Sequence, residues 1–134
     1  MVSFTKKTKV NASGDKVWAI FAHGFNDAHL WMASVPHSYA KTNGESFDGA
    51  CSAGRVCELN PNQNGIKASE KFLAYNEENK TATVQIDFIN TPFLFPVKFN
   101  TLNFSLLDTG TDQSEMTWEF RSTIKPLGLI LWPL

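Results

Sequence analysis

Three stretches in the second half of the chain alternate apolar and polar residues. Their apolar members are Val84, Ile86, Phe88, Leu102, Phe104, Leu106, Met116, Trp118 and Phe120. Successive side chains of a strand point to opposite faces, so this alternation predicts antiparallel strands with one apolar face. Because three neighbouring strands share the pattern, we expect a broad apolar surface that two short helices cannot easily cover.

Turn residues separate seven predicted strands at spacings typical of an antiparallel meander. The strands are Val2–Val10, Ser46–Ser52, Gly54–Leu59, Ile66–Tyr75, Thr81–Ile89, Val97–Leu107 and Ser114–Ile124. The clearest turns are Pro61–Gly65, Asn76–Asn79 and Asp108–Asp112. In these turns Asn, Asp and Gly tolerate positive φ or form local side-chain hydrogen bonds.

Two short helices are predicted after the first strand. Ser13 is a good N-cap for the first helix, and Gly24 ends it. Its apolar stripe at helical spacing consists of Val17, Ile20, Phe21 and Gly24. The second helix covers about Asp27–Ala33, with Leu30 and Trp31 as anchors, and Pro36 ends the helical region. This order of elements predicts an α+β fold.

Length and charge narrow the possible functions. The 134 residues have the usual size of one domain and contain no linker, so we treat residues 1–134 as a single domain. The net charge of −1, from 12 basic and 13 acidic residues, argues against nucleic acid as a partner. No secretory signal is recognisable, and the apolar stretches are far shorter than the roughly 20 residues of a membrane span. We therefore expect a cytoplasmic protein with no membrane span.

The residues that commonly bind metals lack a metal-site pattern. His23, His29 and His37 have no acidic residue spaced as in a zinc-protease helix. Cys51 and Cys57 are too few for a closed zinc site and predict small buried thiols. We predict no metal and no cofactor, and we expect His23 to interact with helix-terminal carbonyls.

Several short motifs, taken in order, resemble one known superfamily. They are residues 13–18 (SGDKVW), Trp31, residues 54–56 (GRV), residues 70–76 (EKFLAYN) and residues 116–118 (MTW). This order is similar to the START-like helix-grip (SRPBCC) superfamily, and within it to the polyketide cyclase/dehydrase-like family. The resemblance implies a curved antiparallel sheet of about seven strands that grips a long C-terminal helix around a hydrophobic cavity.

The C-terminus departs from that family pattern. Only Lys125–Leu134 follows the last predicted strand, which is too short for the grip helix. The chain was cut inside this element, or the sheet is covered in another way, for example by a second copy. Since an open apolar face is a sizeable patch, we expect ligand occupancy or formation of a homo-oligomer.

Two charged residues share the parity of apolar strand positions. Glu70 is in phase with Phe72, and Arg55 is in phase with Cys57, so both are predicted to point into the cavity. A buried carboxylate needs a partner or carries a raised pKa suited to acid–base chemistry. We favour a structural Glu70–Arg55 pair and keep both residues as weak catalytic candidates. A one-residue bulge would reverse the parity and place both in solvent.

Aromatic and aliphatic residues of the apolar face are the candidate ligand contacts. They are Trp118, Phe120, Phe104, Leu102, Phe88, Ile86 and Phe72. For Trp18 and Trp31 we favour core packing. The segment Thr91–Pro96 holds three large apolar residues between prolines and predicts either a cavity lid or packing under a neighbouring element.

Three functions fit these features. The first is binding of a small hydrophobic ligand, such as a lipid, an aromatic molecule or a polyketide-like metabolite, between the sheet and the helices. The second is a polyketide cyclase or dehydratase that uses a buried acid or base. The third is a protein-interaction domain whose open apolar face binds a partner. The sequence leaves the presence of turnover open.

Overall fold

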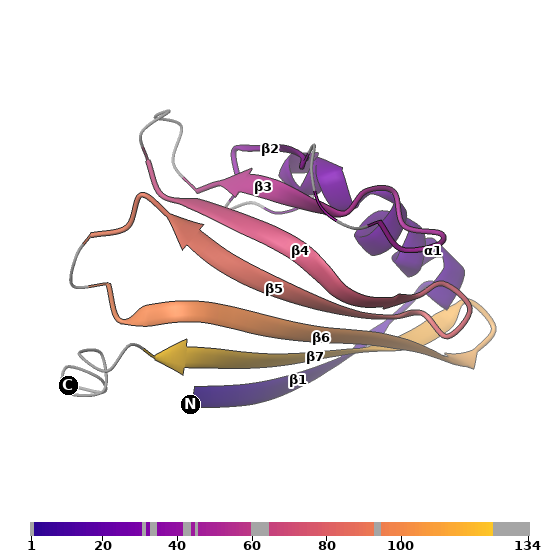
Figure 1. Cartoon of the computed structure of the whole chain (residues 1–134). Coiled ribbons are helices and arrows are strands. Elements are labelled where there is room, and N and C mark those ends of the chain that lie inside the picture. Colours follow the sequence, from indigo (N-terminus) through magenta and orange to yellow (C-terminus); the bar gives the residue numbers. More distant parts are fainter. Residues whose placement is uncertain are drawn as a thin grey trace.

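One seven-stranded antiparallel sheet forms the frame of the molecule (Figure 1). The computed structural model describes residues 2–30, 32, 35–41, 44, 46–59, 65–92 and 95–124. The strands are β1 (Val2–Val10), β2 (His37–Ala40), β3 (Gly54–Glu58), β4 (Lys67–Asn76), β5 (Thr81–Ile89), β6 (Val97–Gly110) and β7 (Gln113–Ile124). Their order is β1-β7-β6-β5-β4-β3-β2, so β1 and β2 are the two edges. The sheet curves, and the helices lie on one side of it.

The predicted meander is confirmed except for one strand. The prediction at Ser46–Ser52 is wrong, because this segment forms turns and irregular backbone. Gly49 has a φ of +84°, which an extended strand does not adopt. The second strand is instead His37–Ala40, which pairs with β3. It shows no apolar alternation, since Ser38 is its one buried residue and is satisfied by hydrogen bonds.

Two of the three predicted turns lie between paired strands as expected. The Asn76–Asn79 turn is closed by a 2.8 Å hydrogen bond from the Asn79 N–H to Asn76 Oδ1. The turn near Asp108 is completed by Asp112, which adopts a φ of +54°. Residues 60–64 of the third turn lie outside the described residues.

The first predicted helix is confirmed, but its buried face is shifted by one residue. It comprises α1 (Gly14–Trp18), capped by Ser13, and a π-helical turn η1 (Ala19–His23). The residues that face the sheet are Trp18, Phe21, Ala22 and Phe25, whereas Ile20 is 55% exposed. Both stripes satisfy helical spacing, and the larger aromatic side chains occupy the sheet side because they bury more apolar area.

The second helix is a 3₁₀ segment, η2 (Phe25–Leu30), which begins two residues earlier than predicted. The prediction of Leu30 as an anchor is wrong, because its side chain is 75% exposed at the end of η2. Trp31 and Ala33 lie outside the described residues. In packing, α1 contacts β6 and β7, while η2 contacts β2 and β3. None of the described helices is long and apolar enough to cross a membrane.

Aromatic packing between helices and sheet forms the main core. Phe21 stacks on Phe104 with ring centroids 3.8 Å apart, and Phe25 contacts Phe72 at 4.4 Å. Trp18 is 2% exposed and also packs on Phe104. The helices therefore fill one part of the concave face. The segment Lys125–Leu134, on which the prediction of a missing grip helix falls, lies outside the described residues.

Candidate ligand cavity

The concave face holds a hollow of about 190 Å³ beside the packed aromatic core. Its apolar lining is Met32, Val35, Cys57, Leu59, Ala68, Ile86, Phe88, Leu102, Trp118 and Phe120, and its polar lining is Arg55, Glu70 and Asn100. Strands β3 to β7 contribute most of these residues, because inward-facing positions recur at every second residue. The hollow is therefore one part of the apolar sheet surface that the aromatic core does not fill; a second part lies beside Val17, Phe21 and Met116.

Arg55 and Glu70 form a buried ion pair at one wall of this cavity. They lie opposite each other in the β3–β4 register and are 3% and 5% exposed. Arg55 Nε donates to Glu70 Oε2 at 3.0 Å, and Arg55 Nη2 donates to Glu70 Oε1 at 3.1 Å. This two-bond geometry is the strongest arrangement for the two groups. The predicted inward pairing is thus present.

The remaining hydrogen-bonding capacity of the pair is also used. Arg55 Nη1 donates to the Phe25 carbonyl at 2.7 Å, and the guanidinium lies 3.9 Å from the Phe25 ring centroid. Cys57 Sγ donates to Glu70 Oε2 at 3.1 Å. Buried charges are tolerated only when they are paired and hydrogen-bonded, and this pair meets that condition. It ties β3 and β4 to η2.

Glu70 points inward as predicted because the bulge in β4 lies after it in the strand. The β4–β5 register shifts between Phe72 and Ala74, which leaves Leu73 without a pairing partner. Ala68, Glu70 and Phe72 therefore all face inward, while Leu73 is 46% exposed.

The Cys57 thiol is not an activated nucleophile. Desolvation by burial, together with the negative charge of Glu70, raises the pKa of Cys57 to about 12. Because the thiolate is the reactive form, Cys57 is inert near neutral pH. Its buried position agrees with the prediction, whereas Cys51 is exposed.

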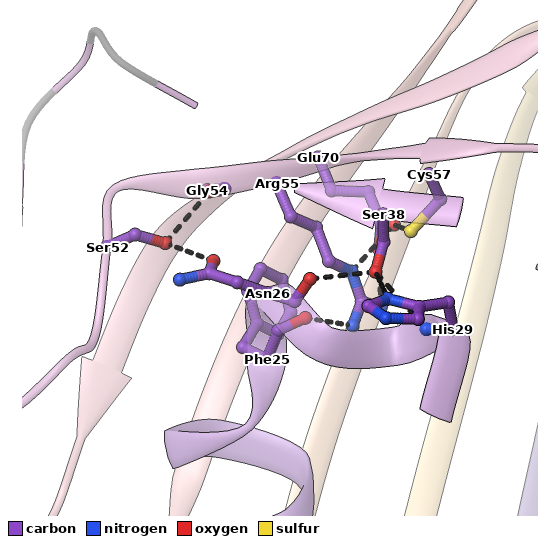
Figure 2. A network of polar contacts seen from close by, with 9 residues as sticks. All are labelled: Phe25, Asn26, His29, Ser38, Ser52, Gly54, Arg55, Cys57 and Glu70. Atoms are coloured by element: carbon purple, nitrogen blue, oxygen red, sulfur yellow. Dashed lines mark hydrogen bonds and ion pairs between the residues drawn. The ribbon is translucent and has the colours of Figure 1, made fainter. Parts of the chain in front are cut away.

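A second polar network joins η2 to the neighbouring strands (Figure 2). Ser38 Oγ donates to the Asn26 carbonyl at 2.7 Å and also contacts His29 Nδ1 at 2.9 Å. Ser52 Oγ lies 2.7 Å from Asn26 Oδ1 and 2.8 Å from the Gly54 carbonyl. Figure 2 shows these contacts beside the Arg55 side chain, which reaches from β3 to Phe25. They hold η2 against β2 and β3, next to the segment that carries the lining residues Met32 and Val35.

Five of the seven predicted ligand contacts line this cavity, namely Trp118, Phe120, Leu102, Phe88 and Ile86. Phe72 and Phe104 belong to the packed core instead. They have the same strand parity as the other five but lie under the helices. Ligand contact of the lining residues stays a prediction.

Sequence reasoning missed several lining residues. Met32 and Val35 come from the segment between η2 and β2, where no periodic pattern marks them. Asn100 could have been found, since it is in phase with Leu102 and Phe104 in the same strand. In the predicted lid, Phe95 packs on Phe88 at 5.3 Å, while Phe93 and Leu94 lie outside the described residues.

A separate polar cluster lies at the end of η1. Trp18 Nε1 donates to Glu77 Oε2 at 2.8 Å, Tyr75 donates its hydroxyl to the same oxygen at 2.8 Å, and His23 Nε2 contacts Glu77 Oε1. His23 therefore binds a carboxylate rather than the helix-terminal carbonyls that were predicted. Desolvation raises the pKa of Glu77, but the hydrogen bonds from Trp18, His23 and Tyr75 outweigh it, so the net pKa is lowered.

The sequence matches a family model described as "Polyketide cyclase / dehydrase and lipid transport" over residues 1–133. The chain belongs to this family. No curated protein matches it with significance. The family description names both enzymes and lipid carriers, so membership supports a ligand-binding START-like domain without choosing between the two.

Solved structures from several organisms share the fold of this chain. A Bacillus cereus protein is 21% identical to this chain, with a TM-score of 0.68. The match covers 94% of this chain and 78% of the Bacillus cereus chain. A START superfamily protein from Mycobacterium smegmatis is 10% identical, with a TM-score of 0.70 and coverages of 92% and 77%. Norcoclaurine synthase from Thalictrum flavum is 18% identical, with a TM-score of 0.64 and coverages of 99% and 76%. These likenesses confirm the helix-grip fold.

Proposed function

We propose that this family member binds a small hydrophobic molecule in the cavity beside Trp118. The observation that carries the proposal is a hollow with a mostly apolar lining whose buried ion pair is already satisfied. Ligand sites in proteins are concave and mainly apolar, with a few polar groups that set orientation. The family description includes lipid transport, which supports the binding of a hydrophobic molecule.

The hollow is open on one side, and its volume indicates the size of the group that it can surround. A cavity of about 150 Å³ holds one benzene ring, so about 190 Å³ accommodates one ring with a small substituent. Burying about 150 Å² of apolar surface contributes roughly 4 kcal/mol. The loss of translational and rotational freedom on binding offsets much of this gain, so a molecule held by this contact alone binds weakly. A ligand that binds more tightly extends beyond the hollow or adds hydrogen bonds.

A structural neighbour suggests suitable probes. The Thalictrum flavum norcoclaurine synthase has been solved in complex with dopamine and hydroxybenzaldehyde. Both are single-ring molecules, which is the size that this cavity supports. We therefore choose hydroxybenzaldehyde as the first test compound.

A cavity-filling variant tests the proposal. Ala68 lies in the cavity wall and is 6% exposed, so Ala68→Leu places three extra carbons in the hollow. Ala74→Leu is the matched control, because Ala74 is exposed on the same strand. In amide NMR titrations with hydroxybenzaldehyde, we expect Ala68→Leu to weaken binding at least tenfold and Ala74→Leu to leave it unchanged. Equal binding by all three proteins would refute this cavity as the site.

Native mass spectrometry of protein purified from its own host complements that test. A bound apolar molecule would be carried along, and its mass would identify its chemical class. The spectrum would also report a homo-oligomer, which stays a prediction together with the cytoplasmic location. A ligand-free monomer would count against both occupancy and self-association.

The contacts of Glu70 favour a structural role over the enzyme alternative. Both carboxylate oxygens accept hydrogen bonds from Arg55, and one also accepts from Cys57. A general base needs a lone pair within reach of the substrate proton, and these contacts leave it poorly available. We therefore propose that Arg55 and Glu70 hold the cavity wall in place.

A further inference from the structure

Within the proposed ligand cavity, one polar side chain has unused hydrogen-bonding capacity. Asn100 lies on the concave face of β6, between Ile86 of β5 and Ser122 of β7 in the sheet register. Asn100 is half-buried. Among the described residues that line the hollow, the other polar side chains are those of Arg55, Glu70 and Cys57. No buried side-chain nitrogen or oxygen among the described residues lacks a hydrogen-bond partner, so the Asn100 amide nitrogen is not sealed in the core and stays accessible from the hollow.

The contact with Ser122 accounts for only half of the Asn100 amide. Ser122 Oγ donates to Asn100 Oδ1 at 2.6 Å, which orients the side chain. A carboxamide also carries two N–H donors. Within the described part of the chain, no residue accepts a hydrogen bond from Asn100 Nδ2.

The other polar groups of the cavity are not available in the same way. Arg55 and Glu70 bind each other, and Arg55 also binds the Phe25 carbonyl. Their charges compensate, so the site presents no free charge to attract an ionic ligand. The Cys57 thiol already donates to Glu70. Among the described residues of the cavity wall, the donors without a partner are therefore those of Asn100.

We propose that Asn100 determines specificity by donating a hydrogen bond to an uncharged oxygen of the ligand. The favoured ligand is an apolar, ring-sized molecule with a carbonyl or similar acceptor oxygen. The ring packs against the apolar wall formed by Leu102 and Phe120, which flank Asn100 on the same face. Ser122 acts as a positioning residue that holds the amide. This inference rests on the proposed ligand-binding function.

Benzaldehyde and styrene form a matched pair of probes, since they differ only in a C=O group against a C=CH2 group. Both should bind the wild-type protein in an NMR titration. We expect Asn100→Leu to weaken benzaldehyde binding about two- to tenfold, the range that one net hydrogen bond provides. Styrene binding should stay equal or become tighter in this variant.

Control variants separate a specific effect from a general one. Asn103→Leu removes an amide from the outer face of the same strand, where it binds Thr83 and Glu119, and should change neither affinity. Asn100→Leu removes the acceptor of the Ser122 hydroxyl, which could impair folding. In that case the double variant Asn100→Leu with Ser122→Ala, which also removes this hydroxyl, is tested instead.

The possible outcomes distinguish this inference from the proposed function. If neither probe binds the wild-type protein, the proposed cavity function fails and the role of Asn100 falls with it. If both probes bind but Asn100→Leu changes them equally or not at all, the role of Asn100 is refuted while ligand binding stands. Selective loss of benzaldehyde supports both.

Discussion

Removing one charge of the buried Arg55–Glu70 pair should destabilise the fold strongly. The substitution Glu70→Gln leaves the Arg55 guanidinium, which is 3% exposed, without a counter-charge. It also breaks one of the two bonds at 3.0 and 3.1 Å, because a carboxamide has one acceptor oxygen. Breaking a buried pair in this way costs about 3–5 kcal/mol.

That loss is a large fraction of the total stability, which is about 5–15 kcal/mol for a domain. Since each 1 kcal/mol shifts Tm by about 4 °C in a chain of this size, we expect Tm to fall by about 12–20 °C. Urea unfolding followed by circular dichroism measures the same change as a shift in midpoint at constant m-value.

A control and a double variant make the result interpretable. Glu119→Gln removes the same charge from a half-exposed pair with Arg121, at 2.9 Å, and should cost no more than about 1 kcal/mol. Arg55→Met combined with Glu70→Gln removes both charges and should recover part of the loss. If Glu70→Gln costs as little as Glu119→Gln, the description of Arg55 and Glu70 as a stabilised buried pair is wrong.

The same variant tests the enzyme alternative. In a structural role, Glu70→Gln lowers stability but keeps the affinity for an apolar probe below its unfolding temperature. In an acid–base role, turnover of a polyketide-like substrate would be abolished while the ligand still binds. Loss of turnover by a variant that is folded and binds normally would overturn the structural assignment.

Two further predictions concern titratable groups. Burial and Glu70 raise the pKa of Cys57 to about 12, so iodoacetamide at pH 8 should modify exposed Cys51 and leave Cys57 unmodified until the protein unfolds. Peptide mass spectrometry would locate the modified cysteine. Rapid labelling of both thiols in the folded protein would contradict this prediction. Because the pKa of Glu77 is lowered from about 4.5, its contribution to stability is present above that value and is lost as pH falls through the lowered pKa. Glu77→Gln should therefore flatten the acid limb of a plot of unfolding free energy against pH, and an unchanged acid limb would refute the role of its hydrogen bonds.

The main strands and the polar pair could be predicted from the sequence because they depend on local pattern. Alternation in β5, β6 and β7 places side chains on two faces whatever the neighbours are. The inward parity of Glu70 and Arg55 follows from the same rule, and a buried carboxylate then requires a cationic partner. Ser13 likewise caps α1 through a contact within one turn of the chain.

Long-range packing decided the features that the pattern did not reveal. His37–Ala40 is an edge strand held by one neighbour and by Ser38 hydrogen bonds, so it carries no alternation, and a strand was predicted at Ser46–Ser52 instead. The choice of Trp18 and Phe21 over Ile20 as the buried helix face depends on stacking with Phe104, which is distant in sequence.

The boundary between core and cavity is also a tertiary property. Phe104 and Trp118 have the same inward parity, yet one is covered by the helices and the other borders a hollow. Parity fixes the face on which a side chain lies, but only the placement of α1, η1 and η2 determines which part of that face is filled. The volume left beside Trp118, and the free donors of Asn100 within it, therefore follow from three-dimensional packing alone.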